Sequence, residues 1–342
     1  MTKPLSLISG LFIFLSILNP IFVKPITSFF SEYIFFISFV FLLLLISADY
    51  KKIIIPKFTF TIILIFIVCS FHSLFFKLSL EFYVIYISAF YVSIICGFNK
   101  SNNFKSQIYF SVIFLIIGLL STLLAYIQWL GFSQGQSFVL SLTGNRPYAN
   151  FAQPNHLATF LFLSLISLYY LYEKNKVNIC VFLVINIFLL WGIVLTQSRT
   201  AWLVIFFIPL FLLFKSPKVQ LKISKQQLVS LLVSFWVMVI SLPYVNQWLS
   251  PYFNIVQSSS LVERATTGHL RLNIWTQMIH AILEKPWFGY GWGQTTSAQY
   301  AVIDRYHGTE WASSAHNILL DILVWCGIPL GLLIIGYFTY LY

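Results

Sequence analysis

The chain has 342 residues, of which 59% are hydrophobic and only 8% charged, and phenylalanine alone occurs 36 times. A soluble domain of this length does not carry so much apolar side chain, so a water-soluble fold is excluded. The formal net charge of +11 comes mostly from lysines in short loops between apolar runs. Membrane topology explains these lysines, and we therefore expect no nucleic-acid partner.

Apolar stretches follow one another along the chain, each close to the length that a helix needs to cross the hydrocarbon core of a bilayer. They cover Leu5–Val23, Phe29–Ile46, Phe58–Phe76, Leu78–Phe98, Ile108–Leu130, Leu157–Tyr172, Val177–Leu195, Thr196–Phe214, Leu228–Pro243 and His316–Tyr342. The alternation typical of a membrane β-barrel is absent. We therefore predict an all-α, polytopic helical protein with about 10–11 transmembrane helices in the lipid bilayer, forming a single membrane domain over residues 1–342.

Basic residues alternate between the loops and so predict the orientation. The loops after the second, fourth, sixth and eighth stretches hold two or more lysines each: Lys51, Lys52 and Lys57; Lys100 and Lys105; Lys174 and Lys176; Lys215, Lys218, Lys222 and Lys225. The other short loops hold one basic residue each: Lys24, Lys77, Arg146 and Arg199. The positive-inside rule then places the N-terminus in the cytoplasm and the loops 131–156 and 244–315 outside.

Arg199 stands between two apolar runs and needs a local reason to be there, because an arginine costs roughly 2.5–3.5 kcal/mol at the centre of a membrane helix. The run after it reaches a normal span length only if its helix starts near Thr196. This start predicts that Arg199 lies about one turn inside the helix. Two interpretations stay open: a side chain that snorkels to the interface, or an anion site at the membrane boundary.

The stretch Thr143–His156 runs directly into the sixth span and contains two prolines and a glycine. Gln153 and Asn155 supply neutral hydrogen-bonding groups at the helix entrance. Asn155 suits either a helix N-cap or a substrate contact. For the stretch as a whole we favour a turn that faces substrate.

The long loop Tyr244–Ala315 holds most of the other polar residues, and loops of this length are usually functional or separately folded. Apolar residues near helical spacing predict an amphipathic helix over Leu270–Leu283 on the outer membrane surface, with Arg271 at its beginning. Further on, Pro286–Gln294 alternates glycines with aromatic residues, which suits sugar faces or an interfacial aromatic belt. His316 opens the last apolar stretch.

Two arginines and a histidine on one side of a membrane fit a particular chemistry. Arg199 and Arg271 can bind phosphate oxygens bidentately, and a neutral His316 can accept a proton. A lipid-linked sugar diphosphate presents such a leaving group at this depth, and fixed positive charge stabilises its departure. The outer side has no Asp-x-Asp pair, no His-Glu-x-x-His motif and no carboxylate cluster, so we predict a reaction without metal or cofactor.

The same residues resemble, in order, the motifs of the O-antigen ligase superfamily. The matching elements are Gly144-Asn145, Gln153-Pro154-Asn155-His156, Ser198-Arg199-Thr200-Ala201-Trp202, Arg271 with Trp275, Phe288-Gly289-Tyr290-Gly291-Trp292-Gly293 and Ala315-His316-Asn317. Gln-Pro-Asn and Gly-Tyr-Gly-Trp-Gly look most like the PglL-type protein O-oligosaccharyltransferases. The match covers residues 131–342, most clearly about 140–330, whereas the spans in residues 1–130 carry little signature.

This resemblance implies transfer of a preassembled glycan from undecaprenyl pyrophosphate to a serine or threonine of an exported protein, such as a pilin-like one. The reaction would take place on the periplasmic face of the bacterial inner membrane. By the family pattern Arg199 and Arg271 match the diphosphate-binding arginines, and His316 matches the residue that activates the acceptor. The residues expected to contact substrate are Asn145, Gln153, Asn155, His156, Ser198, Trp275, Tyr290 and Trp292.

Members of this branch usually continue past the histidine helix, so we expect this chain to lack their C-terminal region. The nearest alternative is an O-antigen ligase, which gives the same donor to a lipid A core sugar, followed by an O-antigen polymerase. A transporter of polyisoprenoid-linked sugars would show inverted repeats and broken helices near the midplane. A purely structural membrane subunit would not explain Arg199.

Overall fold

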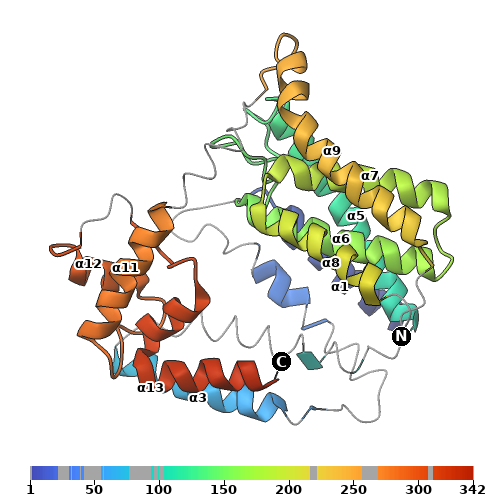
Figure 1. Cartoon of the computed structure of the whole chain (residues 1–342). Helices are drawn as coiled ribbons and strands as arrows, with labels where there is room; N and C mark the ends of the chain where they lie inside the picture. Colours follow the sequence, from blue (N-terminus) through green and yellow to red (C-terminus); the bar gives the residue numbers. More distant parts are fainter. Residues whose placement is uncertain are drawn as a thin grey trace. The chain divides into compact units, whose positions relative to one another are not determined.

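A computed structural model describes residues 2–21, 31, 33–38, 40–41, 55–56, 58–76, 94–95, 99, 104–215, 222–255, 269–306 and 311–341 (Figure 1). The chain divides into two compact units, which are described separately below. Unit 1 consists of Met1–Ile53 and Asn99–Ser259, and unit 2 of Ile54–Phe98 and Ser260–Tyr342. The assignment of the whole chain to a single membrane domain stays a prediction.

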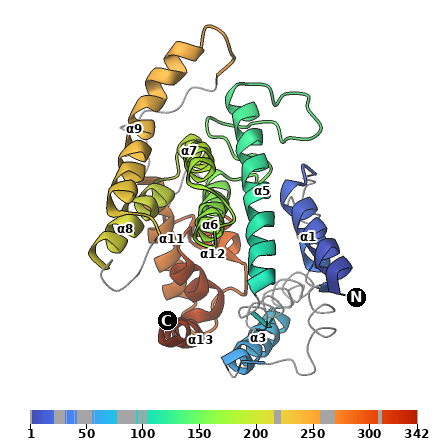
Figure 2. The same cartoon turned by 90° about the vertical axis from the view of Figure 1, so that its right-hand side faces the viewer.

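Unit 1 is a bundle of apolar helices. Its members are α1 (Thr2–Leu18), α5 (Phe104–Trp129), α6 (Pro154–Glu173), α7 (Ile179–Thr196), α8 (Arg199–Lys215) and α9 (Lys225–Leu249). Within it, α5, α6 and α7 pack on one another, α1 lies beside α5, and α9 lies along α7 and α8 (Figure 2). Small residues allow close approach: a Cβ built on Gly118 would lie 2.2 Å from the Ser164 hydroxyl oxygen of the neighbouring helix.

Unit 2 contains α3 (Phe58–Phe75), α11 (His269–Glu284), α12 (Thr295–Val302) and α13 (Ile318–Leu341). The amphipathic helix predicted over Leu270–Leu283 is confirmed as α11. One stripe of α11 with Ile274, Met278 and Ala281 is buried in the unit, whereas Leu272 and Ile279 are exposed. An exposed apolar stripe on such a helix suits the membrane interface.

α13 is not one straight helix. Gly327 interrupts it with φ of 74° and ψ of 176°, and Pro329 follows two residues later. A Cβ built on Gly331 would lie 3.2 Å from the Leu323 Cα, so the residues after the break pack back on those before it. The last apolar stretch therefore forms two arms, not the continuous span that its hydropathy predicts.

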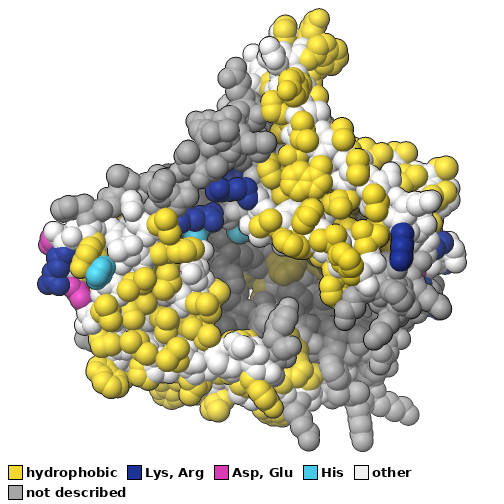
Figure 3. Space-filling view, viewed as in Figure 1, with side chains coloured by type: hydrophobic (Ala, Val, Ile, Leu, Met, Phe, Trp, Pro, Cys, Tyr) yellow, Lys and Arg dark blue, Asp and Glu magenta, His cyan; other side chains and the backbone are white. Residues whose placement is uncertain are grey.

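The all-α membrane class is confirmed. Among the described residues, five helices qualify by length and composition alone to cross a membrane: Lys105–Trp129, Pro154–Glu173, Ile179–Thr196, Lys225–Leu249 and Ile318–Tyr340, the last of which is broken at Gly327. Hydrophobic side chains cover most of the α7–α9 surface drawn in Figure 3, as expected for helices in contact with lipid. The total of about 10–11 stays a prediction, since half of 29–46 and most of 78–98 lie outside the described residues.

Candidate functional site

The turn between α7 and α8 places Arg199 at the start of a helix. α7 ends at Thr196, Gln197 adopts a left-handed conformation with φ of 48°, and α8 begins at Arg199. The Ser198 hydroxyl lies 3.5 Å from the Ala201 backbone nitrogen, where it forms a weak N-terminal cap. The prediction that Arg199 lies one turn inside the helix is therefore wrong, because the left-handed residue ends one helix before the next begins.

This position adds to the positive charge of Arg199. The first backbone N–H groups of a helix lack intrahelical partners and form the positive end of its dipole. The Arg199 side chain is exposed at this end of α8, whereas Ser198 is 2% exposed and its hydroxyl serves the helix cap. A helix N-terminus combined with a guanidinium favours an anion.

Arg146 holds three segments of unit 1 together. Its Nε donates to the Thr196 carbonyl at 2.8 Å, and its Nη2 donates to the Asn155 side-chain oxygen at 3.1 Å. The guanidinium thus joins the loop before α6, the first turn of α6 and the end of α7. From the sequence, Arg146 is expected only as the basic residue of a short loop. Its place beside Gly144-Asn145, within a predicted motif, was the signal that could have identified it.

Two buried amides fix the loop that carries Arg146. Gln128 donates to the carbonyls of Leu140 and Ala149, and its oxygen accepts from the backbone of Tyr148 and Ala149. Asn150 accepts from the Leu140 backbone and donates to two further carbonyls. Because these amides satisfy backbone groups on several sides, the loop has a defined shape at the end of the bundle.

The other predicted residues of this stretch lie around the entrance of α6. Gln153 is the N-cap residue of α6, although its side chain forms no capping hydrogen bond. Asn155 is not the N-cap, because α6 begins at Pro154; it lies in the first turn, where its side chain accepts from Arg146. His156 is exposed and Asn145 is partly exposed. Their predicted contacts with substrate stay predictions.

Unit 1 has a motif end and a lysine end. At the motif end, Arg146 reaches α6 and the end of α7, and the Trp129 indole donates to Asn246 near the end of α9. At the other end, Lys222 donates to the Tyr172 carbonyl at 2.7 Å. The polar motifs thus gather opposite the lysine-rich loops within the unit, as the alternation of basic residues predicts.

In unit 2, His316 lies in a loop that is fixed on one side by α11. His316 is exposed and has φ of 53°, a left-handed conformation that is uncommon for residues other than glycine. The Trp275 indole donates to the Ala315 carbonyl at 2.9 Å. Arg271 lies one turn before Trp275 on the same face of α11 and is exposed. The predicted Arg271, Trp275 and His316 therefore meet in one region of unit 2.

Asp321 fixes the same loop from the other side. This carboxylate is 3% exposed and accepts from the Ala315 backbone at 2.9 Å, the Ser314 hydroxyl at 2.7 Å and the Thr295 hydroxyl at 2.9 Å. A buried carboxylate with three donors is well compensated and rigid. Asp321 is not among the site residues predicted from the sequence. A charged residue in an otherwise apolar run, five positions after His316, was the available signal.

The glycine–aromatic segment packs its backbone against the break in α13. The Tyr290 and Gly291 N–H groups donate to the carbonyls of Val324 and Trp325 at 2.9 and 3.0 Å. These carbonyls precede the break, so the segment replaces helical partners that the break removes. A Cβ on Gly289 would lie 2.4 Å from the Val324 carbonyl oxygen, and Gly289 has φ of 64°. Only glycine fits here without displacement of the backbone.

In the glycine–aromatic segment, the two aromatic residues predicted to contact substrate have different surroundings. Tyr290 is 7% exposed within the core of unit 2. Its pKa is raised to about 12, mainly by burial and secondly by the nearby negative charge of Glu284. The Tyr290 phenol is therefore neutral at physiological pH, and Lys285 lies over its ring. Trp292 is partly exposed and lies 5.1 Å from Trp325, ring centre to ring centre. Packing explains the position of Tyr290, and substrate contact stays a prediction for both.

The predicted residues thus form two clusters, one per unit. Arg199 stands near the Arg146–Asn155 pair in unit 1, and His316 stands with Arg271 and Trp275 in unit 2. Their joint action on one substrate stays a prediction. Among the described residues, no group of three or more His, Cys, Asp or Glu side chains could hold a metal ion.

Two family models match the chain. The O-antigen ligase model matches residues 184–335, which include Arg199, Arg271 and His316. The protein glycosylation ligase model matches residues 147–172, which include the Gln153–His156 motif.

Two curated proteins of Acinetobacter baylyi are similar in sequence. A general O-oligosaccharyltransferase is 36% identical over 255 residues, which cover 73% of this chain and 45% of that protein. A ComP-specific O-oligosaccharyltransferase is 33% identical over 348 aligned residues, which cover 97% of this chain and 61% of that protein. The chain thus spans between about half and three fifths of the length of these relatives. From the motifs, the family models and these relatives together, the chain belongs to the O-antigen ligase superfamily and resembles its protein O-oligosaccharyltransferase branch.

Proposed function

We propose that this chain carries the catalytic region of a protein O-oligosaccharyltransferase. It would transfer a preassembled glycan from undecaprenyl pyrophosphate to a serine or threonine hydroxyl of an exported protein. The main supporting observation is the His316 loop, which Trp275 and Asp321 hold from two sides at 2.9 Å while the imidazole stays exposed. A rigid, accessible histidine beside an arginine-bearing helix suits a general base. The two O-oligosaccharyltransferase relatives support the reaction class.

The arginines supply the electrostatic part of the proposed reaction. The bond between the first sugar carbon and the diphosphate oxygen breaks, and its electron pair leaves on the diphosphate. Arg199 is the first residue of α8 and Arg271 lies in the first turn of α11. Each guanidinium therefore works with a positive helix end, which strengthens the stabilisation of the new negative charge.

His316 accepts the proton of the acceptor hydroxyl in the proposed reaction. The acceptor O–H gives its proton to the imidazole as the oxygen bonds to the sugar carbon, so the charge gained by the diphosphate is balanced by an imidazolium. The diphosphate leaves as an anion without protonation and needs no general acid. We propose that no metal takes part, so transfer by purified protein should continue in excess EDTA. Loss of turnover that Mg²⁺ or Mn²⁺ restores would contradict this.

We place the reaction on the periplasmic face of the bacterial inner membrane, with the N-terminus in the cytoplasm. The separation of the motif end from the lysine end of unit 1 supports this orientation. Labelling of single cysteines tests it. A cysteine introduced at exposed His156 should react with a membrane-impermeant reagent from the periplasm, whereas one at exposed Lys176 should not. The reverse pattern would contradict both the orientation and the site.

An O-antigen ligase is the second candidate, since the O-antigen ligase model covers 184–335. The two differ in the acceptor. To distinguish them, the chain is expressed together with an exported acceptor protein in cells that lack the native enzyme. Glycosylation of the acceptor protein and of the lipid A core is then measured. Glycosylated protein that disappears with His316→Ala supports the proposal. Polysaccharide ligated to the lipid A core alone would favour the second candidate. The absence of both products would contradict both candidate functions.

A further inference from the structure

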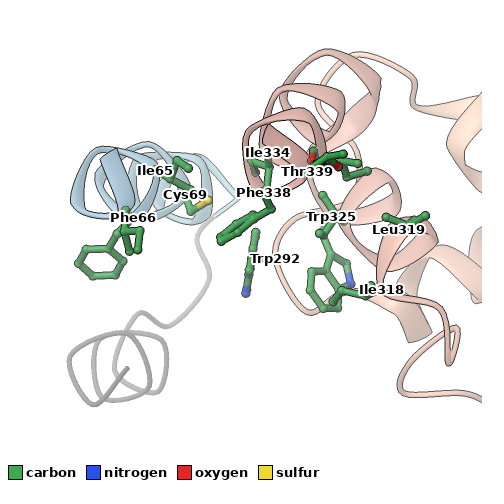
Figure 4. Close-up of a pocket in the computed structure, with 13 residues that line it drawn as sticks. Ile65, Phe66, Cys69, Trp292, Ile318, Leu319, Trp325, Ile334, Phe338 and Thr339 are labelled. Carbon is green, nitrogen blue, oxygen red and sulfur yellow. Dashed lines mark hydrogen bonds between the residues drawn. The ribbon is translucent and has the colours of Figure 1, made fainter. Parts of the chain in front are cut away.

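A cavity of about 590 Å³ lies in unit 2 between α3 and the two arms of α13 (Figure 4). Ile65 and Cys69 line it from α3, and Ile334 and Phe338 from the second arm of α13. Trp325 lines it from the first arm, and Trp292 from the glycine–aromatic segment. Its wall is almost entirely apolar. Such a wall excludes a charged headgroup and suits a hydrocarbon chain.

The break in α13 creates this groove. Ile318 and Thr339 both line the cavity although 21 residues separate them. In a straight α-helix they would lie about 31 Å apart, at 1.5 Å per residue. The left-handed Gly327 returns the second arm toward the first, and α3 closes the remaining side. The groove is thus part of the architecture that also positions the glycine–aromatic segment.

A short chain of hydrogen bonds connects the groove to the His316 loop. The Trp325 indole, in the groove wall, donates to the Thr295 hydroxyl at 2.8 Å, which donates to Asp321 at 2.9 Å. Asp321 in turn accepts from the Ala315 backbone, next to His316. Ile318, two residues after His316, itself lines the cavity. One end of the groove wall is therefore two residues from the proposed base along the sequence, and hydrogen bonds join this wall to the His316 loop.

From this continuity we propose that the groove binds the polyisoprenoid chain of the lipid-linked donor. The inference rests on the proposed function, because the diphosphate must lie at Arg271 and His316 for its chain to enter here. A lipid chain gains little from leaving the bilayer, which is as apolar as the groove, so close packing against the wall must supply the preference. We therefore expect a moderate preference for a long chain over a short one.

The test measures binding rather than turnover. Undecaprenyl pyrophosphate and farnesyl pyrophosphate share the diphosphate and differ in the length of the polyisoprenoid. The ratio of their affinities for the purified protein in nanodiscs therefore reports the contribution of the polyisoprenoid alone. Ile65→Trp and Ile335→Trp fill the groove from α3 and α13. The matched controls are Leu64→Trp and Leu333→Trp on the same helices, at positions that are 59% and 61% exposed and outside the cavity.

We expect the wild type to bind the undecaprenyl compound about tenfold tighter, the factor that roughly two buried methylene groups of contact would give. In the groove variants the affinity ratio should fall close to one, whereas the control variants should keep the wild-type ratio. A ratio that survives in both groove variants overturns the inference, since the chain then lies elsewhere. Failure of the wild type to bind either compound overturns the proposed donor as well. Binding that depends on polyisoprenoid length, without glycan transfer, supports the assignment of the groove and contradicts the proposed function.

If the groove variants do not fold, a photoreactive undecaprenyl pyrophosphate provides a second test on the wild type. Crosslinks to peptides of α3 and α13 support the assignment. Crosslinks confined to unit 1 overturn it.

Discussion

The two units fix their predicted site residues by different means. In unit 1, neutral amides hold the loop: Gln128 and Asn150 bind backbone groups, and Arg146 ties the loop to the helix ends. In unit 2, a buried carboxylate and direct backbone contact hold it: Asp321 accepts three hydrogen bonds, and Gly289 meets the break in α13.

Because their supports differ, the two units should respond differently to substitution. An amide or guanidinium network has several bonds, so the loss of one donor leaves others in place. A backbone contact that only glycine permits has no spare room, and a buried carboxylate leaves its donors unpaired when it is removed. Unit 2 should therefore be the more sensitive of the two, both in stability and in activity.

The largest effect is expected at the backbone contact. Gly289→Ala places a Cβ 2.4 Å from the Val324 carbonyl and adds a left-handed strain of about 1–2 kcal/mol, so unit 2 should not assemble and glycan transfer should be lost. Thermal unfolding in detergent and transfer assays check this. Gly336→Ala is the matched control, because a Cβ there meets nothing within 4 Å and alanine favours helix. Equal unfolding midpoints for the two variants would contradict the contact.

The next effect separates chemistry from folding in unit 2. His316→Ala should reduce transfer about 10²- to 10⁴-fold, the usual range for loss of a general base, while binding of the undecaprenyl pyrophosphate product stays nearly unchanged. The exposed imidazole predicts a small change in the unfolding midpoint. His280→Phe is the control, since His280 stacks on Tyr306 at 3.6 Å and phenylalanine can keep that contact. Wild-type transfer by a folded His316→Ala protein would exclude His316 as the base.

Local sequence signals were enough for much of the fold. Hydropathy and length identified α5, α6, α7 and α9, and apolar spacing identified α11, because each of these helices follows from its own residues. Hydropathy did not reveal the break in α13. A Cβ on Gly327 would lie 2.5 Å from the Trp287 carbonyl, a contact between segments 40 residues apart. Such a conformation depends on tertiary contact that no local pattern records.

The site divides in the same way. The arginines and the histidine could be identified by their types and by a family motif. The residues that position them could not, because Arg146 acts on a carbonyl 50 residues away and Asp321 on a loop that precedes its own helix. Tyr290, expected at the substrate, is buried, since the alternation of glycine and aromatic residues also serves backbone packing.

A smaller effect is expected in unit 1, where two arginines have different tasks. Arg199→Lys keeps the charge but loses the planar fork, so transfer should fall roughly 10²- to 10³-fold, equivalent to about 2.7–4 kcal/mol of transition-state stabilisation. The exposed side chain predicts an almost unchanged unfolding midpoint. Arg146 uses Nε for one acceptor and Nη2 for the other, at 2.8 and 3.1 Å. Arg146→Lys offers one nitrogen in place of this planar pair, so it should lower the midpoint. A lower midpoint for Arg199→Lys than for Arg146→Lys would reverse these roles.

The smallest effect tests whether Asp321 positions His316. Asp321→Asn keeps the size and one acceptor oxygen. That oxygen can keep the Ala315 N–H and the Thr295 hydroxyl, which both donate to Oδ1, while the new –NH₂ group faces the Ser314 hydroxyl, which donates to Oδ2. Loss of one hydrogen bond to a charged group costs about 1.5–3 kcal/mol, so transfer should fall roughly 10- to 100-fold. Because Asp321 acts through the loop, kcat should fall while the KM for the donor and the affinity for undecaprenyl pyrophosphate stay nearly constant.

Asp321→Ala removes all three bonds and should be worse, with Asn restoring part of the rate. Ser70→Ala, on a half-buried α3 side chain outside the loop, serves as the control for a polar change in unit 2. A rise in KM without a change in kcat would show that Asp321 shapes donor binding and does not position the base.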